Sequence, residues 1–374
     1  MGTKLERIME ISATTPKPEF TSLYHLINIE MLKQCHKELD GSKAVGIDKV
    51  TKAEYEEHLE DNLTNLVSKL KNKAYKPLPS LRVFIPKANG KKRPLGIASY
   101  EGFFDHMSHE WMMEFLRLYI KDPNLLWLIN KYLKAGVLTD GVFEESEEGS
   151  AQGNIISPIL ANIYMHNVLT LWYKFVITGR TTGHSFLAVY ADDFIAGFQH
   201  KEDAESYYAL LKERLRKFNL ELEESKSRLI EFGRYAESNS KRKYGRKPET
   251  FDFLGFTFYC GKGRKTGNFC VKLKTNRKKF SMKLKQTKEW LYQNNDLPVK
   301  ELIAKLNKKL VGHYRYYGVS HNMNKLSSFL HYVQRYLFKV LNRRSHKKSY
   351  LWNGYIDMLK VYPLAQPKIY VRLF

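Results

Sequence analysis

Two adjacent aspartates, Asp192 and Asp193, stand between two apolar segments, and this arrangement constrains the fold more than any other stretch. The segments 186–190 and 194–198 are rich in β-branched and aromatic residues, which predicts two strands. A short polar link between two strands predicts a tight hairpin turn, so both carboxylates should lie at one edge of a sheet. An aspartate pair is also typical of an ordinary surface turn, and the rest of the sequence has to decide between the two interpretations.

A divalent cation would suit this pair, because two crowded negative charges cost free energy unless a cation neutralises them. Mg²⁺ takes oxygen ligands and is usually held by one or two carboxylates together with substrate phosphates. Paired Mg²⁺ ions stabilise the attacking and leaving oxygens when a nucleotide is transferred. The hairpin therefore predicts a magnesium site in which Asp192 and Asp193 are the ligands and the catalytic residues.

The charge of the chain points to a polyanionic partner. The formal net charge is +23 and the isoelectric point is about 9.6, which is typical of a protein that binds nucleic acid or an acidic membrane surface. The basic residues are not gathered on one amphipathic helix, which argues against the membrane. The apolar segment 155–177 is interrupted by polar residues and by Lys174, so it predicts a buried helix under a sheet and not a membrane span.

Cysteine usage and the N-terminal sequence exclude other classes of protein. The three cysteines, Cys35, Cys260 and Cys270, have neither a zinc-binding spacing nor the spacing of a disulfide framework. The first residues contain no apolar stretch, so no secretory signal is expected. These observations predict a cytoplasmic protein.

The order of the predicted elements alternates between helices and short strands. Helical spacing covers 23–39, 52–73 with Thr51 as its N-cap, 106–135, 201–217, 299–310 and 326–341. Strands are predicted at 82–86, 95–97 and 251–259, the first two joined by a basic turn. The polar segments 1–20 and 237–250 are expected to be a loose arm and a loop.

A basic run in the C-terminal third is the strongest candidate for a nucleic-acid surface. Residues 261–288 contain eleven Lys or Arg and no Asp or Glu, and apolar residues are interleaved with them. A run without compensating acids is more typical of a polyanion track than of a solvated face. Further along, the segment 312–318 interleaves Arg315 with aromatic rings, which suits stacking on unpaired bases; the alternative is a packing seam between helices. The candidate RNA-binding residues are Lys272, Lys274, Arg277, Lys278, Lys279 and Arg315.

Several motifs appear in a characteristic order. The segment 149–164 (GSAQGNIISPILANIY) precedes the aspartate pair, and the segments 222–228 (LEESKSR) and 253–256 (FLGF) follow it. From about residue 20 to the C-terminus, this order resembles a group II intron-encoded reverse transcriptase/maturase. The resemblance implies an α+β right-hand polymerase in three parts: an N-terminal arm with truncated fingers (1–98), a palm with an antiparallel sheet (99–260), and a helical thumb/maturase X domain with a tail (261–374).

The resemblance also assigns roles to individual residues. Asp192 and Asp193 would hold two Mg²⁺ ions. Basic residues near the fingers hairpin would contact template and nucleotide phosphates, Phe104 would stand where the family has its sugar-discriminating aromatic, and Lys226 would assist the leaving pyrophosphate. The residues so assigned to nucleotide and template are Lys87, Arg93, Phe104, Gln152, Gly153 and Lys226.

The sequence departs from the family at a short join between Ile97 and Gly102. The family carries several dozen more residues here, among them the strand whose aspartate faces the Asp-Asp hairpin and shares its metals. Ser99 stands where that aspartate should be. Either this ligand is lost, or Asp105 or Glu101 replaces it from a shifted position.

The leading hypothesis is an RNA-directed DNA polymerase of a group II intron that also binds intron RNA as a splicing maturase. Its partners would be intron RNA, an RNA template with a DNA primer, and dNTPs, in the bacterial cytoplasm or nucleoid. A maturase that binds RNA without polymerising is the alternative from another class, and a defective mobile-element remnant is the third. The short join is the feature that discriminates between them.

Overall fold

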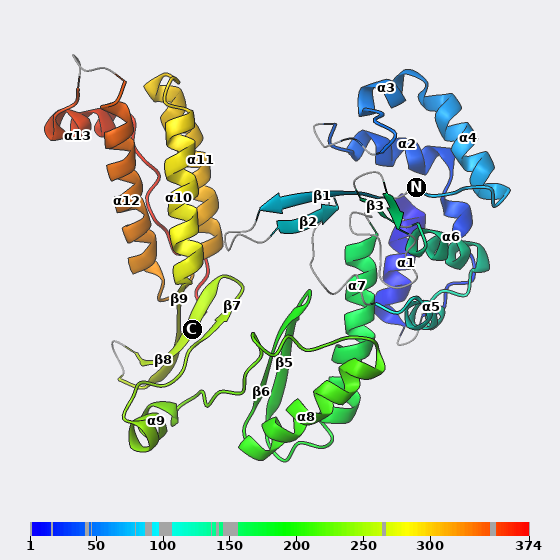
Figure 1. Ribbon diagram of the computed structural model, residues 1–374, viewed down its shortest axis with the longest axis horizontal. Helices are drawn as coiled ribbons and strands as arrows, with labels where there is room; N and C mark the ends of the chain where they lie inside the picture. The colour runs from blue at the N-terminus through cyan, green and yellow to red at the C-terminus, as the bar shows by residue number, and fades with distance from the viewer. Residues whose placement is uncertain are drawn as a thin grey trace. The chain divides into compact units, whose positions relative to one another are not determined.

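The computed structural model describes residues 2–15, 18–41, 45, 47–78, 80–86, 92–96, 107–135, 137–139, 142–144, 156–263, 267–344 and 349–373. The chain forms two compact units, unit 1 (1–228) and unit 2 (229–374), and each is described by itself. Both units combine helices with small, mostly antiparallel sheets, which confirms the α+β class (Figure 1). Within the described ranges, no helix is both long enough and apolar enough to cross a membrane.

The N-terminal part of unit 1 is helical throughout. Thr51 begins a helix as predicted, with a complete capping box in which Thr51 and Glu54 satisfy each other's backbone N–H groups. The predicted helix 52–73 is interrupted at His58, and the expectation of a loose arm at 1–20 is wrong, because residues 2–14 form a helix. The elements are α1 (Gly2–Thr14), the 3₁₀ turn η1 (Tyr24–Leu26), α2 (Ile29–Glu38), α3 (Lys52–Glu57) and α4 (Leu59–Lys71).

The predicted basic hairpin is part of a four-stranded sheet with the order β2-β1-β3-β4. Strand β1 (Ser80–Pro86) pairs antiparallel with β2 (Lys92–Gly96), with Ile85 opposite Arg93. Strand β1 also pairs in parallel with β3 (Val137–Thr139), and β3 pairs antiparallel with β4 (Val142–Glu144). The two strands expected at 82–86 and 95–97 are thus confirmed in position, although the second begins earlier than predicted.

The core of unit 1 lies between helices and a hairpin. The region 106–135 contains two helices separated by a turn at Leu118–Asp122, and the predicted buried helix 155–177 continues from an α-helix into two π-helical turns. Tyr164 is fully buried and donates a hydrogen bond to the carbonyl of Phe218. The helices are α5 (His109–Arg117), α6 (Pro123–Leu133), α7 (Ser157–Met165), η2 (His166–Thr170), η3 (Tyr173–Ile177) and α8 (Lys201–Lys217).

Two long-range polar contacts hold unit 1 together. The carboxylate of Asp122, 5% exposed, caps α6 and accepts hydrogen bonds from the backbone N–H groups of Leu23 and Tyr24. Burial opposes ionisation, but the backbone donors outweigh it and hold the pKa of Asp122 below its ordinary value. The guanidinium of Arg214 donates to the carbonyls of Val168 and Asn167, which a π-helical turn leaves short of partners.

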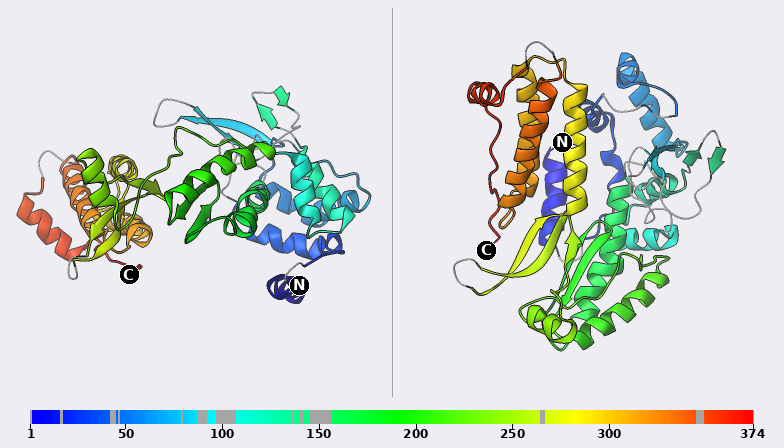
Figure 2. Two further views of the ribbon diagram at one scale, coloured as in Figure 1. Left: turned by 90° about the horizontal axis from the view of Figure 1, so that it is seen from below. Right: turned by 60° about the vertical axis from the view of Figure 1, so that its left-hand side comes forward.

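Unit 2 consists of a three-stranded sheet and a helical bundle. Helices α10, α11 and α12 lie side by side (Figures 1 and 2), and their facing leucines are almost completely buried. The prediction of a loop at 237–250 is wrong for its first half, which is helical. The helix predicted at 299–310 is confirmed and continues to Tyr317. The elements are α9 (Ala236–Tyr244), β7 (Phe251–Phe253), β8 (Phe256–Lys262), β9 (Phe269–Thr275), α10 (Arg277–Gln293), α11 (Val299–Tyr317), α12 (Met323–Leu341) and α13 (Trp352–Val361).

Asn322 joins the sheet of unit 2 to its bundle. Its side chain is fully buried just before α12. The amide oxygen accepts the N–H of Thr275 at 2.8 Å, and the amide nitrogen donates to the Thr275 hydroxyl and to the carbonyl of Tyr317, both at 2.8 Å. One side chain thus connects the end of β9, the end of α11 and the start of α12. Removing it would take the Asn322 partner from the N–H and the hydroxyl of the buried Thr275, whereas the carbonyl of Tyr317 would keep the N–H of Val319.

We therefore expect Asn322→Ala to destabilise unit 2 by about 2–4 kcal/mol, because buried polar groups that lose their partners cost about 1–3 kcal/mol each and partly relax. Amide hydrogen exchange of α10 and α12 would measure the loss. Asn324→Ala, at an exposed position of the same helix, is the matched control and should change stability by less than about 0.5 kcal/mol. Equal effects of the two substitutions would contradict the role of Asn322.

His313 makes the stability of unit 2 sensitive to acid. Its imidazole is 4% exposed, stacks on Phe329 with ring centroids 3.9 Å apart, and has no hydrogen-bond partner on either nitrogen. Burial, helped by the charge of Lys283, lowers the pKa of His313 to about 4 from 6.5. Between these two values the unfolded chain binds a proton that the folded chain does not. The stabilisation is therefore complete above pH 6.5 and is lost as the pH falls toward 4.

The expected loss over this interval is about 3 kcal/mol in the free energy of unfolding of unit 2. His313→Phe keeps a ring against Phe329 but cannot be protonated. The free energy of unfolding of unit 2 should therefore change less with pH in this variant than in the parent. Hydrogen exchange of α11 at pH 4–7 is the measurement. His331→Phe, which replaces an exposed imidazole of α12, should keep the parent's dependence. A parent and a His313→Phe variant with the same pH profile would show that His313 is not the titrating group.

Candidate functional site

The aspartate pair lies at the tip of a two-stranded hairpin, as predicted. Strand β5 (Ser185–Tyr190) pairs antiparallel with β6 (Asp193–Phe198), and Tyr190 stands opposite Asp193. The link is therefore only two residues, Ala191 and Asp192. Both aspartates are exposed. The strand pairing places both aspartates at one end of the two-stranded sheet.

The backbone of this turn is in an uncommon conformation. Ala191 has a φ of +54°, the left-handed region that costs a residue with a Cβ about 1–2 kcal/mol. Such a cost is met where the surrounding structure determines the turn, and strained turns are frequent at functional sites. Here the six paired residues of each strand determine it. A positive φ is also usual in two-residue hairpin links, so this conformation does not by itself distinguish a functional turn from an ordinary one.

The two faces of the hairpin differ. Side chains of alternate residues such as Leu187 and Val189 pack against the core of unit 1, next to α8 (Figure 2). The opposite face carries Phe186 and Tyr190, each 59% exposed, and the ring of Phe186 lies across Gly197 so closely that a Cβ there would come within 2.2 Å of it. The carboxylates thus border an exposed aromatic face that the sequence had not indicated as distinct from the core.

The pair of carboxylates has the donor chemistry for Mg²⁺, but the described residues place no third protein ligand with it. Among the residues whose placement is described, no group of three His, Cys, Asp or Glu comes together to hold a metal ion. No hydrogen bond or ion pair with a described residue occupies Asp192. The residues expected to replace the absent aspartate, Asp105 and Glu101, lie outside the described ranges, as does Ser99.

Among the described residues, none of the other expected site residues is shown in contact with the hairpin. Lys87, Phe104, Gln152 and Gly153 lie outside the described residues, and Arg93 is described only as a backbone position of β2. Their roles stay predictions.

Lys226 lies in an exposed turn after α8, where its N–H donates to the carbonyl of Glu223 at 3.0 Å. The neighbouring Glu224 forms an ion pair with Lys212 of α8 at 2.6 Å, which ties this turn to the helix. No contact joins Lys226 to the aspartates among the described interactions, so its assignment to the pyrophosphate also stays a prediction.

Five of the six predicted RNA-binding residues follow one another along the chain from β9 into α10, all within unit 2. Lys272 and Lys274 lie on one face of β9, opposite the buried Leu273 and Thr275. The chain then enters α10, whose first turn contains the exposed cations Arg277, Lys278 and Lys279 and no acid.

Cations at a helix N-terminus oppose the helix dipole. The three cations and the N-terminal N–H groups of α10 therefore repel one another and together attract an anion.

The aromatic segment 312–318 is mainly a packing seam. His313 and Tyr314 are buried in the bundle, and Tyr316 stacks on Phe256 of β8 with nearly parallel rings. Arg315 is exposed in the last turns of α11. The structure therefore favours the seam for the buried rings and keeps Arg315 as a candidate phosphate contact.

The net positive charge of the chain comes entirely from unit 2. Of the 62 Lys and Arg, 32 lie in 229–374, together with only 8 of the 39 Asp and Glu. Unit 1 has the remaining 30 basic and 31 acidic residues, so it is almost neutral. Such an asymmetry makes unit 2 the candidate for the polyanion-binding part of the chain.

Comparison with known families agrees with this organisation. Residues 46–258 match the family "Reverse transcriptase (RNA-dependent DNA polymerase)". Residues 277–355 match "Group II intron, maturase-specific domain". The first match contains the Asp-Asp hairpin, and the second contains the helical bundle.

Individual relatives are distant. The chain is 27% identical to the "Group II intron-encoded protein LtrA" of Lactococcus lactis subsp. cremoris, over 46% of this chain and 39% of that protein. It is 27% identical to "Protein YkfC" of Escherichia coli (strain K12), over 37% of this chain and 53% of that protein. It is 29% identical to the "Uncharacterized 91 kDa protein in cob intron" of Schizosaccharomyces pombe, over 29% of this chain and 20% of that protein. The chain thus spans about two fifths of LtrA and half of YkfC.

The lengths of these matches support a missing segment. The match with LtrA runs over 233 residues, whereas 46% of this 374-residue chain is about 172 residues. The match with YkfC runs over 201 residues, whereas 37% of the chain is about 138. In both, about 60 positions have no counterpart in this chain, which is the size of segment expected to be missing at the short join.

The motif order, the Asp-Asp hairpin and the basic bundle agree with a family match that covers more than half of the chain. The chain belongs to the reverse transcriptase (RNA-dependent DNA polymerase) family, among the group II intron-encoded reverse transcriptases/maturases.

Proposed function

We propose that the chain binds intron RNA as a group II intron maturase, through unit 2, and that its palm hairpin keeps two of the carboxylates that RNA-directed DNA polymerisation requires. The observation that carries the proposal is the charge of unit 2, with 32 basic and 8 acidic residues. Neutralised phosphates release counterions, so such a unit binds RNA with a large, salt-dependent gain in free energy.

The three-part division proposed from the sequence fits this function. Residues 1–98 are the N-terminal arm and fingers, 99–260 the palm, and 261–374 the thumb/maturase X domain of a right-hand polymerase. The break between compact units falls earlier, after Arg228, so the hairpin β7–β8, which the resemblance assigns to primer contact, belongs structurally with the basic unit. Unit 2 would then contact both the template–primer duplex and the intron RNA.

The second candidate function, polymerisation from dNTPs, rests on Asp192 and Asp193. These residues would hold Mg²⁺, which when bound supplies positive charge to the transferring phosphoryl group. The chain's own contribution is to position the two carboxylates at a strained turn on a paired hairpin. Lys226, and Arg93 with Lys87, would contact nucleotide phosphates, and Gln152 with Gly153 the template.

The short join weighs against efficient polymerisation. Ser99 cannot replace an aspartate, because a neutral hydroxyl brings no charge to hold a divalent ion. A catalytic group that is misplaced by an ångström costs about a hundredfold in rate. The loss of about 60 family positions would also remove part of the wall around the nucleotide. RNA binding depends on none of these groups.

We expect the triple substitution of Arg277, Lys278 and Lys279 to Gln to weaken RNA binding strongly. It should also reduce the slope of log affinity against log salt by about 2–3, because each lost phosphate contact removes about 0.7–0.9. Filter binding over a salt series is the measurement. The matched control replaces Lys69, Lys71 and Lys73 of unit 1 by Gln, which removes the same charge from exposed positions and should leave the slope nearly unchanged. If both triple variants lose the same slope, RNA is not bound preferentially at α10.

We expect primer extension on an RNA template to be very weak or absent in the parent chain, no faster than in Asp192→Ala, while both bind RNA equally. The reason is the absent third carboxylate and the incomplete nucleotide pocket. Extension rates of the parent, Asp192→Ala and Asp105→Ala should be compared on one template. Robust extension by the parent that Asp105→Ala abolishes would show that Asp105 has taken over the missing role and that the chain is an active polymerase.

A further inference from the structure

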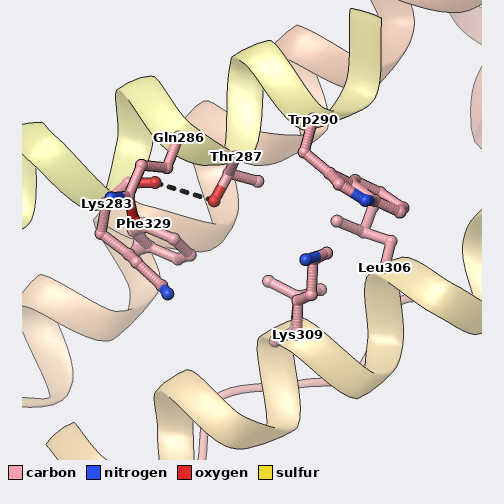
Figure 3. A pocket seen from close by; sticks show the side chains of 8 residues that line it. Lys283, Gln286, Thr287, Trp290, Leu306, Lys309 and Phe329 are labelled. Carbon is pink, nitrogen blue, oxygen red and sulfur yellow. Dashed lines mark hydrogen bonds between the residues drawn. The ribbon is translucent and has the colours of Figure 1, made fainter. Parts of the chain in front are cut away.

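A small cavity opens within the helical bundle of unit 2 (Figure 3). It has a volume of about 90 Å³ and lies between α10, α11 and α12. Thr287, Leu306 and Phe329 are buried and form its floor, and the half-buried indole of Trp290 forms a wall. The floor is rigid, because Phe329 is held on one side by the stacked imidazole of His313 and Thr287 donates its hydroxyl to the carbonyl of Lys283 at 2.8 Å.

The rim of this cavity is positively charged. Lys283 and Lys309 are exposed and line it, with their ammonium groups directed toward the space between the helices in Figure 3. Neither forms an ion pair with a carboxylate in the described part of the chain. The two acids of these helices are already paired, Glu289 with Lys285 at 3.8 Å and Glu301 with Lys305 at 2.8 Å. The rim is therefore free to receive negative charge.

The cavity combines this charge with an aromatic surface. The ammonium nitrogen of Lys309 lies over the Trp290 ring, 4.8 Å from its centre, so the two form a cation–π contact at the opening. A small cavity with an aromatic wall beside two cations suits a ligand with a planar ring and an anionic group. An unpaired nucleotide has both, and unpaired bases in RNA are recognised by stacking on aromatic side chains.

The size of the cavity limits the ligand further. Its volume of about 90 Å³ corresponds to the share of about three water molecules in the liquid. A single six-membered ring suits a cavity of this size better than a fused purine does. The sugar and phosphate would remain outside, at the level of the lysines.

We propose that this cavity receives the base of a single unpaired pyrimidine nucleotide of bound RNA, with its phosphate held by Lys283 and Lys309. The inference rests on the proposed RNA binding by unit 2 and adds a site of defined chemistry to it. Lys283 belongs to the basic run 261–288, so the cavity is continuous with the proposed track for the RNA backbone. A base displaced from a duplex that follows this track would meet Trp290.

The test uses the full chain and three hairpin RNAs that differ at one position: a bulged uridine, a bulged abasic site, and no bulge. The parent should bind the bulged-uridine hairpin about tenfold more tightly than the abasic one, the scale of one base stacked on an aromatic ring. Trp290→Ala should abolish this preference, and Trp290→Phe, which retains a ring and the packing, should keep part of it.

Two neighbouring lysines provide a matched control. Lys308 and Lys309 are both exposed on α11, but only Lys309 lines the cavity. Lys309→Gln and Lys308→Gln remove the same charge, and only Lys309→Gln should reduce the preference for the bulged uridine.

Equal binding of the uridine and abasic hairpins by the parent, or a preference that survives Trp290→Ala, would overturn the site and leave general RNA binding intact. A bulged adenosine bound as tightly as the uridine would overturn the restriction to a single ring. Failure to bind any of the three RNAs would overturn both this site and the proposed function.

Discussion

The concentration of positive charge in unit 2 is the constraint on which the rest of that unit depends. An excess of 24 cations in 146 residues repels itself and destabilises the compact state. Surface ion pairs cannot offset it, because they contribute little and only eight acids are present. The compensation comes from the bundle core, where Leu302, Leu306, Leu326 and Leu337 are completely buried, and from the buried amide of Asn322. A bound polyanion would then stabilise the folded unit by binding it in preference to the unfolded chain.

Unit 1 has the opposite character, since its charges nearly cancel and its candidate site depends on geometry. Asp192 and Asp193 are close because the strands β5 and β6 are paired along their whole length and leave a two-residue turn. The left-handed Ala191 shows that the pairing outweighs the local preference of the backbone. Such a turn presents two acceptors well, but a two-metal site needs further ligands. Those that the family supplies from another strand correspond to the short join of this chain.

The sequence predicted elements whose signal is local and missed those that depend on distant contacts. The Thr51 N-cap, the amphipathic helix α8 and the Asp-Asp hairpin each carry their signal within a few neighbouring residues, and all three were predicted correctly in place. The turn at 118–122 was missed although its signal is local, since Asp122 is an N-cap residue followed by a proline in the first helical turn. The sequence could not show that Asp122 also accepts backbone hydrogen bonds from Leu23 and Tyr24, almost a hundred residues away. The role of Asn322 was missed for the same reason, since its partner Thr275 is 47 residues distant. At the candidate site, the carboxylates were predicted, whereas the partners proposed for them depend on segments outside the described residues.

The two units therefore differ in how their functions respond to the loss of a part. RNA binding by unit 2 is a sum over many cations, each of which contributes a modest, salt-dependent amount, so the loss of one or of a distant segment leaves most of it. Nucleotidyl transfer requires a few groups placed within a fraction of an ångström, and their contributions multiply. About 60 positions of these matches have no counterpart in this chain, and a deletion of that size at the short join would remove catalysis long before it affected binding. On this physical ground, we expect RNA binding to be the function that the chain retains, and the proposed base site in the bundle would let that binding select particular RNA structures.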